Sequence, residues 1–257
     1  MLQVGGGEMS DPAQKKREET GTATASVADE LVRMILGTMV PGASLPSEAE
    51  LAIQHGVSRV TVREAVKMVA GKGLLDLARG RRAVVKAPDG SALGEFISYI
   101  VQSDPTGVFD LVEARMSLEV QAAGLAARRA MRPALVGIEH SLRGMRDARR
   151  LPDGSEDEQA FHEADVAFHQ AIALASGNRI TIGLFEAMAP AVRRSFFMSR
   201  RGRQLRGQAS EHTIEAHQRI FDCIAAGDVA GAEAAMRVHL TDAARDMRAA
   251  IDGGDAA

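Results

Sequence analysis

Three segments of the chain carry Asp or His at positions where the apolar periodicity predicts a buried side chain. In the segment 156–176, Asp165 and His169 are four residues apart, so a helix places both on one face. His217 lies on the apolar stripe of the segment 208–226, and His239 lies on that of 228–250. A single inward histidine is usually a core residue satisfied by a neighbour. Four polar groups on three converging stripes instead predict a shared binding site, because burying them uncompensated is costly.

One carboxylate and three imidazoles form a donor set that suits a borderline divalent cation such as Zn²⁺, Ni²⁺ or Mn²⁺. A structural zinc site would usually include Cys and would be closed. The set Asp165, His169, His217 and His239 leaves coordination positions open for water or a ligand. His162 lies on nearly the same face as Asp165 and is a further candidate for the site or its surroundings.

Arg115 presents the same problem with the opposite charge. It lies on a helical stripe with Leu111 and Leu118, and an inward guanidinium requires an anion. Two alternatives remain open from the residues alone. The anion is an internal carboxylate, Glu119 or Asp165, or it is the carboxylate of a small effector that also fills the open metal positions.

A second kind of chemistry is indicated near the N-terminus. The segment 59–86 holds eight Lys or Arg and two acidic residues, which gives 8 − 2 = +6 in a chain whose net charge is −3. A confined basic patch on a near-neutral chain is typical of a surface that contacts phosphates, although charge runs are more often solvated faces.

The elements around this patch predict a winged helix-turn-helix. Helical periodicity covers 26–40, the capping box Ser47 to Glu50 begins a short helix, and Ser58 caps a third helix. Short strands are expected at 74–77 and 83–86. On the third helix, Arg59, Arg63 and Lys67 share a stripe beside the apolar face, with Thr61 on the exposed arc. Gly80 and Arg81 lie in the turn between the strands, the expected wing.

The rest of the chain is predicted to be helical, so the fold class is mainly α: an N-terminal winged helix-turn-helix and a C-terminal all-helical bundle. We expect a disordered arm at 1–25, the DNA-binding domain at 26–87, a linker at 88–90, the effector- and metal-binding domain at 91–251 and a frayed tail at 252–257. The predicted C-terminal helices are 91–103, 108–131, 133–150, 156–176, 179–201, 208–226 and 228–250. A single cysteine, Cys223, and the lack of an apolar run of about 20 residues favour a cytoplasmic protein without a membrane span.

The N-terminal motifs resemble those of the GntR family. The matching runs are Pro41 to Glu48, Glu50 to Ala52, Gly56 to Ala65 and Gly73 to Leu75. The resemblance implies contacts to operator DNA from Arg59, Thr61 and Arg63, with Gly80 in the wing. Ala49 and Arg82 depart from the pattern, since many members carry Arg and Gly there.

The C-terminal segment resembles the FadR-type ligand-binding domain of GntR regulators, the FCD class. The matching residues are Glu113 to Arg115, Asp165 to His169, Ala175 to Asn178, Glu215 to His217 and His239-Leu240. The resemblance implies that Asp165, His169, His217 and His239 bind the metal and that the effector is a small carboxylate, including hydroxy and sugar acids. Asn178 and Ser195 are expected to line its pocket. Members that bind acyl-CoA lack the metal set, which disfavours that ligand.

These observations predict a metabolite-responsive transcriptional regulator, a repressor that binds double-stranded operator DNA as a homodimer and is not an enzyme. Two alternatives remain. In the first, the metal is purely structural and the protein binds DNA constitutively. In the second, the cluster is the centre of a metal-dependent hydrolase, although Glu163, the nearest general base, faces away from the ligand face.

Overall fold

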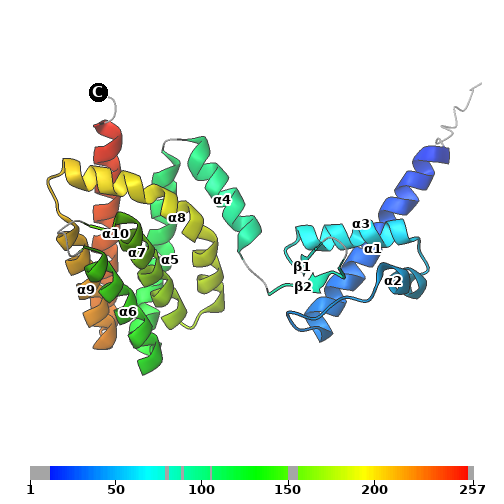
Figure 1. The fold of residues 1–257 in the computed structure, drawn as a ribbon, viewed down its shortest axis with the longest axis horizontal. Helices are drawn as coiled ribbons and strands as arrows, with labels where there is room; N and C mark the ends of the chain where they lie inside the picture. The colour runs from blue at the N-terminus through cyan, green and yellow to red at the C-terminus, as the bar shows by residue number, and fades with distance from the viewer. Residues whose placement is uncertain (1–11, 79–80, 88–89, 105, 150–155, 254–257) are drawn as a thin grey trace, which may run out of the picture. The chain divides into compact units, whose positions relative to one another are not determined.

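The computed structural model describes residues 12–78, 81–87, 90–104, 106–149 and 156–253. The chain divides into two compact units, Met1–Asp89 and Gly90–Ala257. The described residues are predominantly helical, and the single sheet has two short strands, which confirms the predicted fold class (Figure 1). Within these residues, no helix combines the length and the apolarity that a bilayer span requires.

The N-terminal unit consists of three helices and a hairpin. Its helices are α1 (Pro12–Thr38), α2 (Glu48–His55) and α3 (Arg59–Gly71), and its strands are β1 (Leu75–Asp76) and β2 (Val84–Val85). The strands pair antiparallel, and Ser44 forms an additional bridge to Val84. The core is aliphatic and comes from all three helices and both strands; it includes Val27, Leu31, Leu45, Leu51, Val62, Val69, Leu75 and Val85.

Side-chain caps set the start of the two short helices. Ser47 and Glu50 form the predicted capping box at α2, and the hydroxyl of Ser58 accepts a hydrogen bond from Thr61 N at the start of α3. Gly56 ends α2 in the left-handed conformation, with φ at 65°, which glycine adopts without steric cost. The turn between α2 and α3 is therefore determined by local sequence.

The helix α1 begins earlier than the sequence predicts. The expected disordered arm covers 1–25, whereas the structure continues the helix back to Pro12. Residues 13–19 are Ala, Gln, Lys, Arg and Glu, all with high intrinsic helix propensity, and proline is favoured in a first helical turn. Residues 1–11 lie outside the described part of the chain.

The C-terminal unit is a bundle of seven helices within the described residues. They are α4 (Ser91–Ser103), α5 (Gly107–Arg129), α6 (Arg132–Arg149), α7 (Glu158–Ala175), α8 (Arg179–Leu205), α9 (Ser210–Ala225) and α10 (Val229–Asp252). The closest neighbours are α6 with α7, and α10 with α5 and α8. Phe168, Ile172, Ile220, Met236 and Leu240 lie at the centre of the core. Pro190 is accommodated inside α8, which continues past the predicted end at 201.

Glycines allow α8 to approach two neighbouring helices closely. A Cβ atom at Gly94 would lie 2.9 Å from the carbonyl oxygen of Ala187, and one at Gly90 would lie 2.9 Å from the backbone nitrogen of Ala187. Further along α8, a Cβ at Gly202 would overlap the carbonyl oxygen of Asp246 on α10. At these positions backbone packs on backbone, and no larger residue fits without displacing a helix.

Candidate metal centre and nucleic-acid interface

The structure brings the four predicted ligand residues together in the core of the bundle. The Nε2 atom of His169 lies 3.3 Å from that of His217 and 3.2 Å from that of His239. Asp165 completes the cluster, since its Oδ1 lies 3.1 Å from His217 Nε2. His169 and His217 are completely buried or nearly so, and His239 is 9% exposed. Helices α7, α9 and α10 therefore each contribute to one compact donor set.

The outer nitrogens of two of these imidazoles are already engaged. His217 Nδ1 lies 2.7 Å from the carbonyl oxygen of Thr213, and because a carbonyl can only accept, Nδ1 carries the hydrogen. His169 Nδ1 likewise lies against a carboxylate oxygen of Glu119. In the neutral rings, both Nε2 atoms therefore direct lone pairs into the cluster, toward each other and toward Asp165.

Glu119 connects this cluster to the buried arginine. Arg115 Nε donates to Glu119 Oε1 at 2.5 Å, while Glu119 Oε2 faces His169. Burial alone would raise the pKa of Glu119, but the charge of Arg115 and the hydrogen bond with His169 lower it to about 2. The carboxylate thus stays ionised and holds the imidazole in the tautomer that presents Nε2 inward.

The donor set fits a divalent cation. At Zn–N bonds of about 2.0–2.1 Å, two nitrogens of a tetrahedral site lie about 3.3 Å apart, which matches the distances from His169 Nε2 to the Nε2 atoms of His217 and His239. A single proton can bridge only one pair of these nitrogen and oxygen atoms. One metal cation can accept the lone pairs of all of them at once. Burial holds the pKa of His239 well below its ordinary value, as expected of a neutral ligand.

A small cavity lined by polar and apolar residues adjoins the cluster. It encloses about 50 Å³ and is bordered by Arg115, Asp165 and His239 on one side and by Ser195 and Arg203 among others. Because one water needs about 10–15 Å³, this space has room for a few waters between the side chains as they stand. Ser195 lies where the sequence predicts, although its hydroxyl already donates to the carbonyl of Val192.

Asn178, expected to line the effector pocket, does not border this cavity in the described structure. Its side-chain oxygen accepts hydrogen bonds from Ile180 N and Thr181 N and so caps α8. Asparagine is among the preferred N-cap residues because its oxygen satisfies backbone donors that the helix leaves free.

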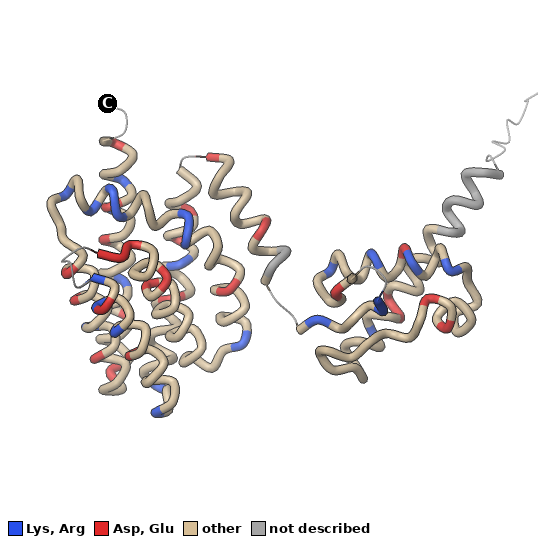
Figure 2. Tube along the Cα trace, viewed as in Figure 1, with Lys and Arg blue, Asp and Glu red and all other residues tan. Residues whose placement is uncertain are grey.

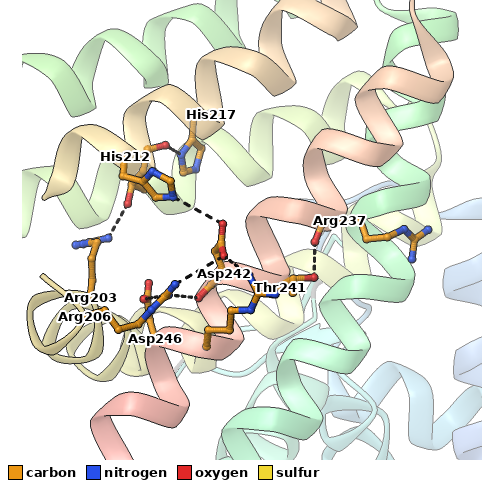
Figure 3. A network of polar contacts seen from close by, with 10 residues as sticks. Arg203, Arg206, His212, His217, Arg237, Thr241, Asp242 and Asp246 are labelled. Carbon is orange, nitrogen blue, oxygen red and sulfur yellow. Dashed lines mark hydrogen bonds and ion pairs between the residues drawn. The ribbon is translucent and has the colours of Figure 1, made fainter. Parts of the chain in front are cut away.

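A network of charged groups forms the far side of the cavity, where α8, α9 and α10 meet (Figure 3). Arg206 pairs with Asp246 at 2.5 Å and with Asp242 at 4.0 Å, and His212 lies 3.7 Å from Asp242. Arg203, which is buried, donates to Thr213 Oγ1 at 2.7 Å. The same residue Thr213 offers its carbonyl to His217, so the network touches the support of a ligand imidazole.

His162 is a buried polar residue at the edge of the cavity. Its ring stacks on Phe196 at 3.9 Å, and neither ring nitrogen has a hydrogen-bond partner among the described residues. It borders the cavity but is not part of the compact cluster of three imidazoles. The structure thus places His162 beside the cavity, as the sequence suggests, and not among the ligands.

In the N-terminal unit, basic residues of α3 and of the hairpin line a second groove. Arg59, Arg63, Lys67 and Arg81 border it together with Arg82. Lys and Arg recur along α3 (Figure 2). Arg63 is paired with Glu48 at 2.7 Å and Lys67 with Glu64 at 2.8 Å, both on the exposed surface. Such exposed pairs are weak, so phosphates or bases can displace the carboxylates. Gly80 lies outside the described residues.

Thr61 does not lie on the exposed arc of α3, contrary to the prediction. It is 6% exposed, and its hydroxyl lies 2.9 Å from that of Ser58. It therefore supports the helix cap from inside the domain. The exposed side chains of the first two turns are Arg59, Val60, Arg63 and Glu64.

Replacing Arg63 by alanine is expected to weaken operator binding by about 10- to 100-fold, because we expect its guanidinium to contact the DNA and alanine cannot make this contact. Fluorescence anisotropy at fixed salt, with a duplex selected from a random pool by the wild-type chain, measures this loss. Arg33→Ala is the matched control, since Arg33 is an exposed residue of α1 outside the groove. Equal losses in both variants would indicate a general charge effect and contradict the prediction.

Sequence reasoning considered Glu119 only as a partner for Arg115 and missed its contact with His169. The spacing Arg115–Glu119, one helical turn on the stripe of α5, was the available signal. It also missed Arg203 and Asp246, which are buried at the cavity wall. They fall in the part of α8 and α10 where charged residues are frequent, so periodicity alone does not single them out.

The chain matches two family models. Residues 23–85 match the model described as bacterial regulatory proteins, gntR family, and residues 110–242 match the FCD domain. An Escherichia coli (strain K12) protein described as a regulator of the L-lactate dehydrogenase operon is 32% identical over 204 residues, which are 78% of this chain and 76% of that protein. The galactonate operon transcriptional repressor of the same strain is 28% identical over 221 residues, 84% and 92% of the two chains.

A solved structure shares the architecture. The GntR protein of Streptococcus agalactiae aligns over 85% of this chain and 97% of its own, with a TM-score of 0.66 and 27% identity. The helix-turn-helix at the basic groove and the histidine-containing helical bundle fit the same family as these relatives. The chain belongs to the GntR family of bacterial regulatory proteins, with an FCD domain as its C-terminal unit, and is a DNA-binding transcription regulator and not an enzyme.

Proposed function

We propose that this regulator is a repressor of a metabolic operon and that its C-terminal unit binds a divalent metal and a small hydroxy or sugar acid. The observation that carries the proposal is that three imidazole nitrogens meet beside a carboxylate. The Nε2 atom of His169 lies 3.3 Å from that of His217 and 3.2 Å from that of His239, and Asp165 contacts His217 Nε2. Asp165 and these three imidazoles would hold the ion, which supplies a Lewis-acidic point for a carboxylate or hydroxyl oxygen.

The cavity supports an acid as the occupant. Arg115 and Arg203 border it, and each has guanidinium nitrogens beyond the ones bound to Glu119 and Thr213. Planar guanidinium groups bind carboxylates through two parallel hydrogen bonds. Two relatives regulate operons named after lactate dehydrogenase and galactonate, and lactate and galactonate are both hydroxy acids.

Binding of operator DNA as a homodimer is part of the proposal. A helix-turn-helix reads few base pairs by itself, and two copies related by a twofold axis read two half-sites of a pseudo-palindrome. The regulator is then expected to have one conformation that binds DNA and one that does not. An acid that binds one of them more tightly shifts the population toward it and so changes operator occupancy.

We expect one hydroxy or sugar acid to weaken operator binding by about 5- to 150-fold, which corresponds to the typical coupling free energies of about 1–3 kcal/mol. Anisotropy titrations of the labelled operator would use the metal-loaded full chain with L-lactate, galactonate and other hydroxy and sugar acids. EDTA should abolish the effect of the acid, because the acid loses its anchoring cation. Formate, which lacks the hydroxyl, is the matched negative control.

A second function is favoured by one contact. Arg115 already has an internal partner in Glu119, so the buried charge does not require an effector. In this alternative the metal is purely structural and DNA binding is constitutive. Loss of thermal stability on chelation, together with an operator affinity that no acid changes, would support this alternative and overturn the first.

A further inference from the structure

Val60 occupies an unusual place for an apolar residue. It is the second residue of α3, and 65% of its surface is exposed. At about 100° per residue, it points almost directly away from the buried stripe of Val62, Ala65 and Val69. Lys67, two turns further along the helix, shares this outward direction.

The neighbours of Val60 are those of a DNA-reading surface. Arg59 and Arg63 lie on the same exposed arc and border the basic groove. In helix-turn-helix proteins, the N-terminal residues of the second helix reach the base edges in the major groove. Thr61 cannot take this role in the described conformation, because it is buried and its hydroxyl meets that of Ser58.

The chemistry of the major groove leaves one partner for an isopropyl group. Each base presents nitrogen and oxygen donors or acceptors there, and only thymine adds an apolar group, its C5-methyl. We propose that Val60 reads a thymine by packing against this methyl group, while Arg59 and Arg63 contact the neighbouring bases or phosphates. Val60 is then a residue that determines operator specificity and contributes through apolar contact alone.

Single exposed apolar residues also occur on ordinary surfaces, where they contact nothing. Replacement of thymine by deoxyuridine separates the two cases, because it removes the methyl group and leaves the hydrogen-bonding edge unchanged. Burial of one methyl group changes affinity by roughly fourfold. This change in affinity is small, but it is measured directly by comparing two duplexes that differ in one methyl group.

The experiment uses the full chain and an operator selected from a random duplex pool by the wild-type protein. Each thymine is replaced in turn by deoxyuridine, and affinity is measured by anisotropy. We expect one thymine position at which the wild type loses roughly fourfold in affinity and Val60→Ala loses none. Alanine has the higher helix propensity, so this variant keeps α3 intact.

Met68→Ala is the matched control, since Met68 is also exposed on α3 but lies near its C-terminal end. This variant should retain the wild-type pattern of deoxyuridine sensitivity. Two results would overturn the proposal: a wild-type operator in which no thymine is sensitive, or a sensitivity that Val60→Ala retains at every position. Because both chains are compared on the same duplexes, a general loss of DNA binding does not imitate the expected result.

Discussion

Replacing His217 by alanine is expected to lower metal affinity by more than about 100-fold, because loss of even an outer partner of a ligand costs 10- to 100-fold. His217 is fully buried, its Nδ1 donates to the carbonyl of Thr213, and its Nε2 faces both Asp165 and His169. The affinity is measured by competition with a chromophoric chelator for Zn²⁺, Ni²⁺ and Mn²⁺.

His212→Ala is the control for this experiment. His212 lies on the same helix, α9, but its side chain is 43% exposed and faces Asp242. The control should bind metal as the wild type does. A thermal melt gives a second readout: added metal should raise the Tm of the wild type and of His212→Ala but not that of His217→Ala. A wild-type chain that binds none of the three ions, or a His217→Ala variant that keeps its ion, contradicts the assignment of this site.

Replacing Arg115 by methionine is expected to lower the free energy of unfolding by about 3–5 kcal/mol, because it leaves the buried carboxylate of Glu119 without its cation. Both side chains are about 95% buried, so solvent does not screen the lost charge. Methionine fills the space of the aliphatic stem but carries no charge. Urea denaturation followed by circular dichroism measures the change, with EDTA in every sample so that metal binding does not contribute.

Two further variants test the physical cause. Arg115→Met combined with Glu119→Leu should recover most of the lost stability, since replacing both members of a buried pair by apolar residues is often neutral. Arg128→Met, at an exposed position of the same helix, should change stability by less than about 0.5 kcal/mol. If the double variant is as unstable as the single one, lost packing and not an unpaired charge explains the effect.

Much of the architecture follows from local sequence. Gly56, Ser47 and Ser58 set the turn between α2 and α3, and their roles are visible as motifs before any tertiary contact is known. The helix 91–103 was predicted with the same bounds that the structure has for α4. Strong breakers and caps act over a few residues, which is why they can be read from sequence.

The errors arise where a second contact decides the outcome. Thr61 lies at the edge of the buried stripe, is 6% exposed and pairs its hydroxyl with that of Ser58. Asn178 is expected to line the effector pocket, but its side-chain oxygen accepts a hydrogen bond from Ile180 N and caps α8. Glu119 could be placed on the face of Arg115, but its contact with His169 requires the packing of α5 on α7, which periodicity does not encode.

The contact between α4 and α8 has a mechanical consequence. Gly90 and Gly94 rest on the backbone of Ala187, and α8 continues from there to Val192 and Ser195 at the cavity. A side chain at such a contact could change rotamer and absorb a small shift, but two touching backbones behave as a stiff joint. We therefore expect a displacement of α8 beside the cavity to reach Gly90, the first residue of the C-terminal unit, and not to be absorbed at this contact.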